Sequence, residues 1–259
     1  MNRLGGIILF LFGINLRAQS SFIALGQNPA NPMSAFSLAV SPAVFPKSKM
    51  SAGVWGGNRF TGTDLANGGI CGHFQLRHTA LGLSTTYAGR PEHAFTTVQA
   101  NLSQQFSPRL SAGVSAGVSS ILQISGYPNQ SRFTGKLGLL YTFIPNAEVS
   151  VLLENPWLDH RSFFPEYPLA ALSVGYHFDT ITRAWIQYRN DPQRGPVWGV
   201  AVAHSPARNI TLFASAQTGA EPLAGGIRFQ KSALRAELST AWHSRLGFSP
   251  TFSLLWSAR

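Results

Sequence analysis

The stretch "GYPNQSRFTGKLGLLYTFIPNAEVSVLLENP", residues 126–156, alternates in polarity, turns once and alternates again. Large apolar side chains occupy every second position of residues 137–143, and the alternation resumes after the tripeptide "IPN" at residues 144–146. Successive side chains of a β-strand point to opposite faces, so a period of two indicates a strand with one apolar face. The stretch therefore predicts two strands joined by a short turn.

The same alternation recurs along the chain. In "RLSAGVSAGVSS", residues 109–120, leucine, alanine and valine alternate with serine and glycine, and no convincing helical period interrupts the pattern elsewhere. About fourteen strands are predicted, near residues 49–59, 69–77, 79–88, 94–106, 109–124, 132–143, 146–154, 168–178, 182–190, 196–204, 208–218, 222–230, 232–242 and 249–258.

The connections between these segments alternate in length. Even-numbered segments are followed by short connections such as "RH", "SPR" and "QK", whereas odd-numbered segments are mostly followed by longer ones such as "NPWLDHRSFFPEYP". Short turns therefore collect at one end of the predicted sheet and longer loops at the other. Bacterial outer-membrane barrels have this asymmetry, with short periplasmic turns and longer outer loops.

The composition separates a membrane barrel from a soluble sandwich. Only 12% of the residues are charged and 44% are hydrophobic, whereas soluble domains average about 25% charged residues. A sandwich buries its apolar faces and needs a charged exterior, but a membrane barrel turns its apolar face to lipid. Closure also pairs every backbone donor within the membrane. The sequence thus predicts an all-β fold, a transmembrane antiparallel up-and-down β-barrel of about fourteen strands over residues 49–259.

Phenylalanines recur at one end of the predicted strands. Phe106, Phe143, Phe178 and Phe229 each end an even-numbered segment, just before a short turn. Each has the parity of the apolar face. Aromatic rings favour the boundary between hydrocarbon and headgroups, so these residues predict an aromatic girdle at one interface.

The first eighteen residues have the three parts of a signal peptide. Arg3 supplies a positive start, residues 4–16 are largely apolar, and Ala18 is a small residue before the expected cleavage point. A membrane anchor is the alternative, but the apolar run is shorter than the roughly 20 residues of a spanning helix. Residues 1–18 are therefore predicted to direct export.

The net charge and the sequence motifs limit which ligands and which reactions are expected of this protein. The net charge of +10 is scattered rather than gathered in a Lys/Arg block, which favours attraction to outer-membrane lipid and lipopolysaccharide phosphates over nucleic-acid binding. Cys71 is the sole cysteine, so an intramolecular disulfide is excluded. The seven histidines form no metal-ligand motif, and no nucleophile elbow is present. We expect neither an enzyme nor a metal or cofactor site.

Charged residues on the polar face of the strands are the candidate lumen residues. An ionised side chain that faces the bilayer centre costs a few kcal/mol, so parity predicts that these residues point inward. They could cross-link a packed lumen or line a selective pathway. The candidates are Lys136, Glu154, Arg189, Arg228, Arg235 and Glu237.

One long loop is rich in aromatic residues. Residues 155–168 contain Trp157, Phe163, Phe164 and Tyr167. Exposed aromatic side chains at a barrel mouth can capture an apolar ligand or dock a partner protein. They can also fold over the mouth or sit among the outer headgroups, and the sequence leaves these alternatives open.

The two ends of the barrel region resemble a known family. "PMSAFSLAVSPAVFPKSKMSAGVWGGNRF", residues 32–60, is similar to the "WSAFNNPAGLA" to "ENRF" stretch of PorV-like and PorQ-like outer-membrane barrels of Bacteroidota, within the FadL-like group. "LGFSP" at residues 246–250 matches the family's last hairpin. The residues that fit the first pattern are Ser34, Ala35, Phe36, Pro42, Ala43, Gly53, Val54, Asn58, Arg59 and Phe60.

The resemblance implies a fourteen-stranded barrel in the outer membrane and two functions. The first is a non-enzymatic PorV-like role in or near type IX secretion, with secretion-system subunits or secreted cargo as partners at the outer loops. The alternative is a FadL-like channel for uptake of hydrophobic small molecules. Residues 19–48, rich in proline, form either a hatch folded into the lumen, as the resemblance implies, or a periplasmic lead segment.

Overall fold

The computed structural model describes residues 39–58, 60–61, 63–90, 93–123, 130–157, 168–191, 195–218 and 223–258. The predicted signal peptide and most of residues 19–48 lie outside these ranges. Within them, no helix has the length and apolarity needed to cross a membrane.

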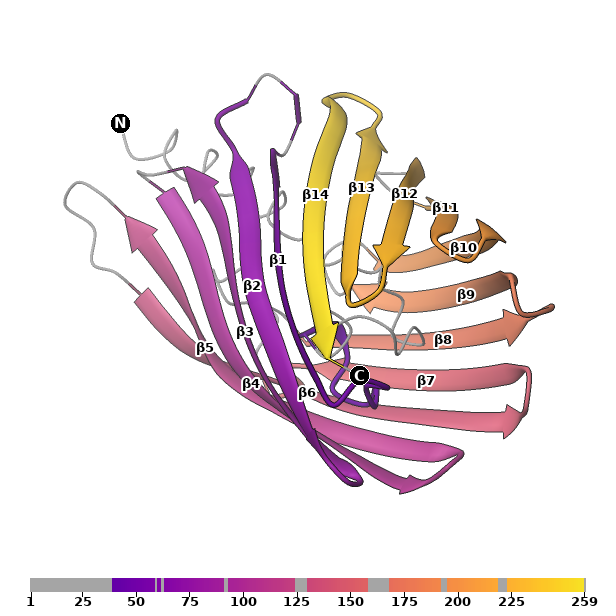
Figure 1. Cartoon of the computed structure of the whole chain (residues 1–259). Helices are drawn as coiled ribbons and strands as arrows, with labels where there is room; N and C mark the ends of the chain where they lie inside the picture. The colour runs from indigo at the N-terminus through magenta and orange to yellow at the C-terminus, as the bar shows by residue number, and fades with distance from the viewer. Residues whose placement is uncertain are drawn as a thin grey trace, which may run out of the picture.

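Fourteen antiparallel strands form one closed barrel, as the alternation predicted. Each strand pairs with the next in the chain, and β14 pairs with β1, so the sheet has no free edge (Figure 1). The strands are β1 (Met50–Asn58), β2 (Ala66–Leu76), β3 (Thr79–Arg90), β4 (His93–Ser107), β5 (Leu110–Gln123), β6 (Gln130–Ile144), β7 (Ala147–Glu154), β8 (Leu169–His177), β9 (Thr182–Asp191), β10 (Gly195–Ala207), β11 (Ile210–Gln217), β12 (Leu223–Lys231), β13 (Leu234–His243) and β14 (Gly247–Ala258).

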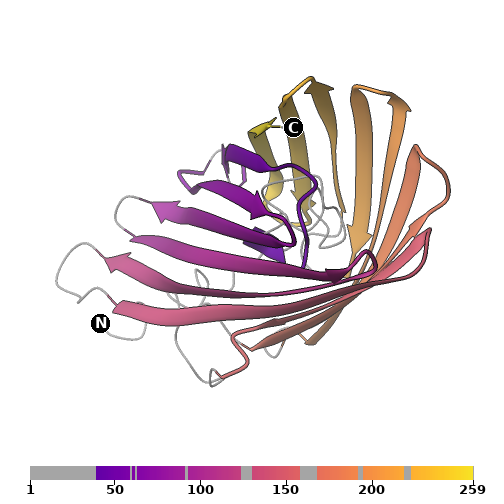
Figure 2. The same cartoon turned by 60° about the horizontal axis from the view of Figure 1, so that its bottom comes forward.

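The large apolar side chains point away from the barrel interior. Along β8, Leu172 and Val174 are 43% and 42% exposed, while Ala171 and Ser173, which alternate with them, are 6% and 2% exposed. Most of the other strands show this alternation, which is weakest in β12, and Figure 2 shows the strands surrounding a common interior. The polarity is the reverse of a soluble protein's, because the interior takes the small and polar residues and the outer wall takes the apolar ones.

The two sequence motifs that resemble the PorV-like barrels meet where the sheet closes. The backbone N–H of Phe60, which follows β1, donates to Oγ of Ser249 in β14 at 3.1 Å. Thr61 N–H donates to the carbonyl oxygen of Phe248 at 2.7 Å. Phe60 is 2% exposed. These motif residues therefore join the first and last strands, which is a role in closing the fold.

Two strands differ from the predicted ranges by three residues at one end, and the other strand ends lie within two residues of the prediction. β2 begins at Ala66 rather than near residue 69, because Gly68 and Gly69 continue the ladder opposite Gly56 and Trp55. β10 extends to Ala207, past the predicted end at residue 204, through an irregularity in its pairing with β11. The polarity pattern cannot locate a strand end at glycines, because glycine has no side chain. It also fails at a bulge, because the extra residue breaks the period of two.

Aromatic residues lie at both rims of the barrel. Phe106, Phe143, Phe178 and Phe229, predicted as a girdle, are all exposed on the outer surface beside the short turns. At the opposite rim the rings of Tyr188 and Trp198, partners on β9 and β10, have centroids 4.8 Å apart. The sequence reasoning missed this pair, because the two residues lie on different strands and their contact depends on the register between β9 and β10.

Candidate functional site in the barrel lumen

The lumen wall formed by β4, β5 and β6 is polar. Hydroxyl and amide side chains point inward from these strands, and the hydroxyl groups of Thr97 and Ser119 lie 2.9 Å apart on neighbouring strands. The buried members of this wall are Thr97, Gln99, Asn101, Ser103, Ser111, Ser115, Ser119 and Thr134. Small polar side chains leave room in front of the wall.

Residues 39–49, here called the plug segment, occupy part of that room. Ser41, Ala43 and Val44 are fully buried although they belong to no strand. The Ser111 hydroxyl on β5 donates to the carbonyl oxygen of Ala43 at 2.6 Å. Lys136 Nζ on β6 donates to the carbonyl oxygen of Ala39 at 2.8 Å. The wall thereby satisfies backbone carbonyl groups that water would otherwise bind.

Two glycines allow the plug segment to approach the wall closely. A Cβ atom at Gly113 of β5 would collide with the carbonyl group of Pro42. A Cβ atom at Gly138 of β6 would lie 2.9 Å from both Cβ and the backbone nitrogen of Ala43. Real Cβ atoms do not approach other heavy atoms this closely, so the packing depends on glycine at both positions.

The end of the plug segment next to β1 contacts β2. The backbone N–H of Gln75 donates to the carbonyl oxygen of Lys49 at 2.7 Å. The His73 ring of β2 contacts residues on either side of the start of β1. In the tautomer with the proton on Nε2, His73 Nε2 donates to the carbonyl oxygen of Ser48 at 3.1 Å, and His73 Nδ1 accepts from the Ser51 hydroxyl group at 2.8 Å. Because its contacts run from β2 to β5 and β6, the segment reaches from one part of the lumen wall to another.

The structure places all six predicted charged residues on strands, at inward-facing positions. Lys136 and Glu154 form an ion pair at 3.7 Å between β6 and β7. Arg228 and Glu237 form another at 2.8 Å between β12 and β13. Arg235 lies beside the second pair, whereas Arg189 is on β9 in register with Ala171 and Val197. Whether these residues act on a solute stays a prediction.

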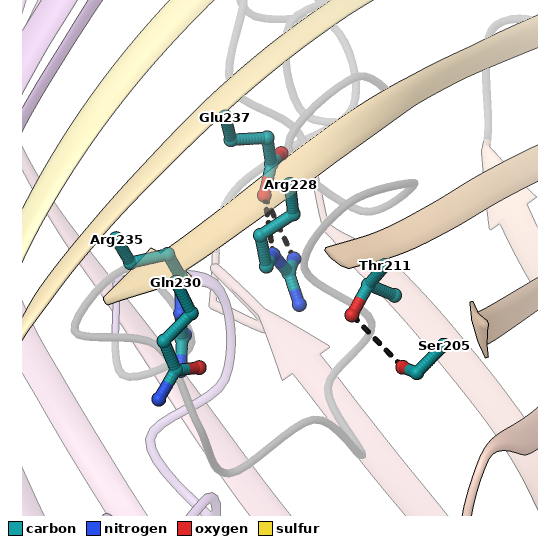
Figure 3. A network of polar contacts seen from close by, with 6 residues as sticks. All are labelled: Ser205, Thr211, Arg228, Gln230, Arg235 and Glu237. Atoms are coloured by element: carbon teal, nitrogen blue, oxygen red, sulfur yellow. Dashed lines mark hydrogen bonds and ion pairs between the residues drawn. The ribbon is translucent and has the colours of Figure 1, made fainter. Parts of the chain in front are cut away.

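The pair on β12 and β13 belongs to a larger polar network (Figure 3). Arg228 donates from Nε and Nη2 to Oε2 of Glu237, both at 2.8 Å. Arg235 Nη2 donates to Oε1 of Gln230 at 3.2 Å. On the neighbouring strands the hydroxyl oxygens of Ser205 and Thr211 lie 2.9 Å apart. Thr211 is in register with Arg228, so the two residues are neighbours on β11 and β12.

Sequence reasoning missed a second acidic residue on β7. Glu148 Oε1 lies 3.6 Å from His177 Nε2 on β8. A Cβ atom at Gly175 would lie 3.0 Å from the same carboxylate oxygen and 2.8 Å from the Trp185 ring. The alternation of β7 already placed Glu148 on the face of Glu154, six residues away, so parity could have found it.

Trp157, predicted as an outer-loop contact residue, lies on the outer wall of the barrel. Its ring stacks on Phe133 of β6 with centroids 5.7 Å apart, and it covers Gly135, where a Cβ atom would lie 2.5 Å from the indole. Asn155 fixes the start of this loop, since its Oδ1 accepts the Gly135 N–H at 2.8 Å. The other three predicted contact residues, Phe163, Phe164 and Tyr167, lie outside the described residues.

The described ranges contain no cluster of three or more His, Cys, Asp or Glu residues that could hold a metal ion.

The comparisons with known proteins concern the fold. No family model matches the sequence, and no curated protein matches it. Among solved structures, the chain is similar to the CymD monoaromatic hydrocarbon channel, with a TM-score of 0.62 at 11% identity over 87% of this chain and 93% of that one. It is also similar to a deletion mutant of the TodX monoaromatic hydrocarbon channel, with a TM-score of 0.61 at 10% identity over 85% and 92%.

A third similar structure is the outer-membrane protein Omp33 of Acinetobacter baumannii, with a TM-score of 0.54 at 11% identity over 81% of this chain and 98% of that one. The fold is thus that of outer-membrane β-barrels, which confirms the predicted architecture. No sequence match supports the PorV-like group in particular.

Proposed function

We propose that this protein is an outer-membrane channel for small molecules whose lumen is controlled by the plug segment. The observation that supports this most is the burial of Ser41, Ala43 and Val44 inside a closed barrel, against a wall of hydroxyl groups. A segment inside a barrel restricts the path through the lumen, and outer-membrane barrels include both open and plugged examples. Movement of the segment would therefore open or close the path.

The contacts of the plug segment suit such movement. The bonds from Ser111 and Lys136 end on backbone carbonyl groups of the segment, and the segment is joined to the barrel through β1. The bond from the neutral Ser111 hydroxyl contributes about 0.5–1.5 kcal/mol and the bond from the charged Lys136 ammonium about 1.5–3 kcal/mol, because water replaces both when they break. Release of the segment into a hydrated lumen therefore costs little compared with unfolding a strand.

The lumen wall indicates the solute class. Two of the similar structures are named monoaromatic hydrocarbon channels, which favours the FadL-like alternative over secretion. The described wall here is not continuously apolar, however, since it carries serine and threonine hydroxyls and the Arg228–Glu237 pair. We therefore extend the proposal to small solutes that combine an apolar body with a polar group.

The PorV-like secretion role rests on the sequence resemblance. The motif residues Phe60 and Ser249 bond to each other at the closure of the sheet, so the fold alone accounts for their presence. A gentle detergent pull-down that recovers secretion-system subunits or secreted cargo would favour that role over the channel.

Conductance tests the proposal. The full exported chain and a variant lacking residues 19–46 are reconstituted in planar bilayers, with heat-dependent mobility on gels as the control for a folded barrel. We expect low or intermittent conductance from the full chain and a larger, steady conductance from the variant. Equal conductance of the two folded proteins would show that the segment does not control the lumen.

A further inference from the structure

Five exposed basic residues lie at the rim of the barrel that carries the short turns. Four of them lie in, or directly before, the turns after β2, β4, β10 and β12. Lys49 precedes β1 at the same rim, since its carbonyl oxygen accepts the N–H of Gln75 near the end of β2. The five are Lys49, Arg77, Arg109, Arg208 and Lys231.

Closure of the sheet brings these residues together, although they are spread from residue 49 to residue 231 in the chain. Because β14 pairs with β1, the turns after β10 and β12, the start of β1, and the turns after β2 and β4 follow one another around the rim. Each of these successive positions carries one of the basic residues. The charge that is scattered in the sequence therefore forms one uninterrupted row of these five residues, here called the cationic arc.

Neutral and acidic residues occupy the rest of this rim. Asn146 lies in the turn after β6, and Asp179 lies in the turn after β8, where its carboxylate accepts two backbone N–H groups. Glu148, near the start of β7, lies beside His177 of β8. Within the ranges that the structure describes, no acidic side chain forms an ion pair with the cationic arc. Its positive charges are therefore available to an external anion.

Aromatic residues on the outer wall indicate the depth of the cationic arc in the membrane. Phe106 precedes Arg109 by three residues and Phe229 precedes Lys231 by two, and both phenylalanine rings are exposed. Such rings favour the boundary between hydrocarbon and headgroups. Two or three residues of strand span no more than about 10 Å. The basic residues therefore lie on the headgroup side of this boundary, at the depth of the lipid phosphates.

We propose that the cationic arc binds the headgroups of anionic phospholipids in the leaflet that surrounds the short turns. A basic residue at a membrane surface favours an anionic lipid about fivefold. In outer-membrane barrels the short turns face the periplasm, so this leaflet is the periplasmic one. An arc that follows the circumference fits the ring of lipids around a barrel, whereas a compact partner protein would contact only part of it.

The lipid selectivity of the folded barrel tests the proposal. The full exported chain is reconstituted in phosphatidylcholine vesicles that contain a trace of spin-labelled phosphatidylglycerol or spin-labelled phosphatidylcholine. Electron paramagnetic resonance measures the fraction of each labelled lipid that is immobilised at the barrel surface. We expect phosphatidylglycerol to associate about two- to threefold more strongly, because the arc covers part of one leaflet and the measurement averages over all lipids in contact.

Three variants assign the selectivity to the cationic arc. The triple variant Arg77→Gln, Arg208→Gln and Lys231→Gln should lose most of the preference for phosphatidylglycerol. Arg245→Gln removes an exposed arginine from the turn between β13 and β14, at the opposite rim, and should leave the preference unchanged. Asn146→Lys adds a basic residue next to the arc and should increase the preference. Folding of each variant is checked by its heat-dependent gel mobility.

Salt separates binding of lipid headgroups from binding of free phosphate. At an ionic strength of about 1 M the Debye length is about 3 Å, so the preference should largely disappear. Sodium chloride and sodium phosphate of equal ionic strength should reduce it equally, and a stronger effect of phosphate would overturn the proposal in favour of a free anion.

The selectivity itself decides the occupant of the cationic arc. A preference for phosphatidylglycerol that the triple variant loses and Arg245→Gln keeps supports the proposal. Equal association of the two lipids with the unmodified protein, or an unchanged preference in the triple variant, overturns it and favours an acidic partner protein. The measurement does not involve conductance, so its result is independent of the channel proposal.

Discussion

The carbonyl group of Pro42 lies against the Cα atom of Gly113, in the space that any side chain at position 113 would fill. Pro42 belongs to the plug segment and Gly113 to β5, and 71 residues separate them in the chain. The contact is possible because β5 alternates glycine and serine on its lumen face. The lack of a side chain at Gly113 therefore helps to position the plug segment, as do the hydrogen bonds from Ser111 and Lys136.

Substitution of Gly113 should displace the plug segment. In Gly113→Val the new side chain occupies the position of the Pro42 carbonyl group, so we expect a larger conductance in planar bilayers than the unmodified protein gives. Ala112→Val places the same side chain on the outer face of the same strand and is the control. If the Gly113→Val protein folds and conducts as the unmodified protein does, the plug segment does not control the conductance.

Removal of the Trp157 ring should weaken the outer rim. The indole stacks on Phe133, and an aromatic pair contributes about 0.5–1.5 kcal/mol beyond its buried area. We expect Trp157→Ala to lower the free energy of unfolding by at least this amount in lipid vesicles, measured by urea titration. Trp157→Phe keeps a ring and should lose much less; equal losses in the two variants would exclude the stacking as the cause.

The turn between β8 and β9 should respond to acid. The Asp179 carboxylate accepts the backbone N–H groups of Ile181 at 2.7 Å and Thr182 at 2.5 Å. These bonds lower the pKa of Asp179 below its ordinary value of 3.8 because they stabilise the charged form, and the bond from Ile181 has the largest effect. A group with a lowered pKa stabilises the fold above its unfolded pKa and loses this effect as the pH falls through its folded pKa.

Asp179→Asn removes that titration while keeping an acceptor oxygen. The unmodified protein should therefore be the more stable one at neutral pH, and its advantage over Asp179→Asn should shrink as the pH falls below 3.8. Urea unfolding of both proteins in vesicles at neutral and acidic pH measures the difference. An advantage that stays constant with pH would contradict the role of the charge.

The sequence predicted the barrel because its signal is repeated in every strand. Alternation places Leu172 outside and Ser173 inside from neighbouring letters alone, and the same rule placed Arg228 and Glu237 on one face. The particular contacts that close the barrel could not be predicted in this way, since the bond between Phe60 and Ser249 joins residues 189 apart. Local polarity contains no information on which distant residues meet there.

The candidate site was predictable only in part, for the same physical reason. Parity gave the direction of each charged side chain but not the register between strands, and register decides that Arg228 faces Glu237 while Arg235 faces Gln230. The plug contacts depend on Gly113 and Gly138, which have no polarity to read. Trp157 could not be placed, because a residue beyond the end of a strand has no parity.

Arginine substitutions at two depths in the membrane test whether the apolar side chains of the strands face lipid. The membrane location depends on this orientation. Leu83, near the middle of β3, is 61% exposed, and Leu76, at the end of β2 beside a short turn, is 53% exposed. An outward-facing arginine costs about 2–4 kcal/mol at the bilayer midplane and about 0–1 kcal/mol near the interface. Leu83→Arg should therefore reduce the free energy of unfolding in vesicles much more than Leu76→Arg does. In a barrel surrounded by water both arginines would be hydrated equally, and the two variants would be equally stable.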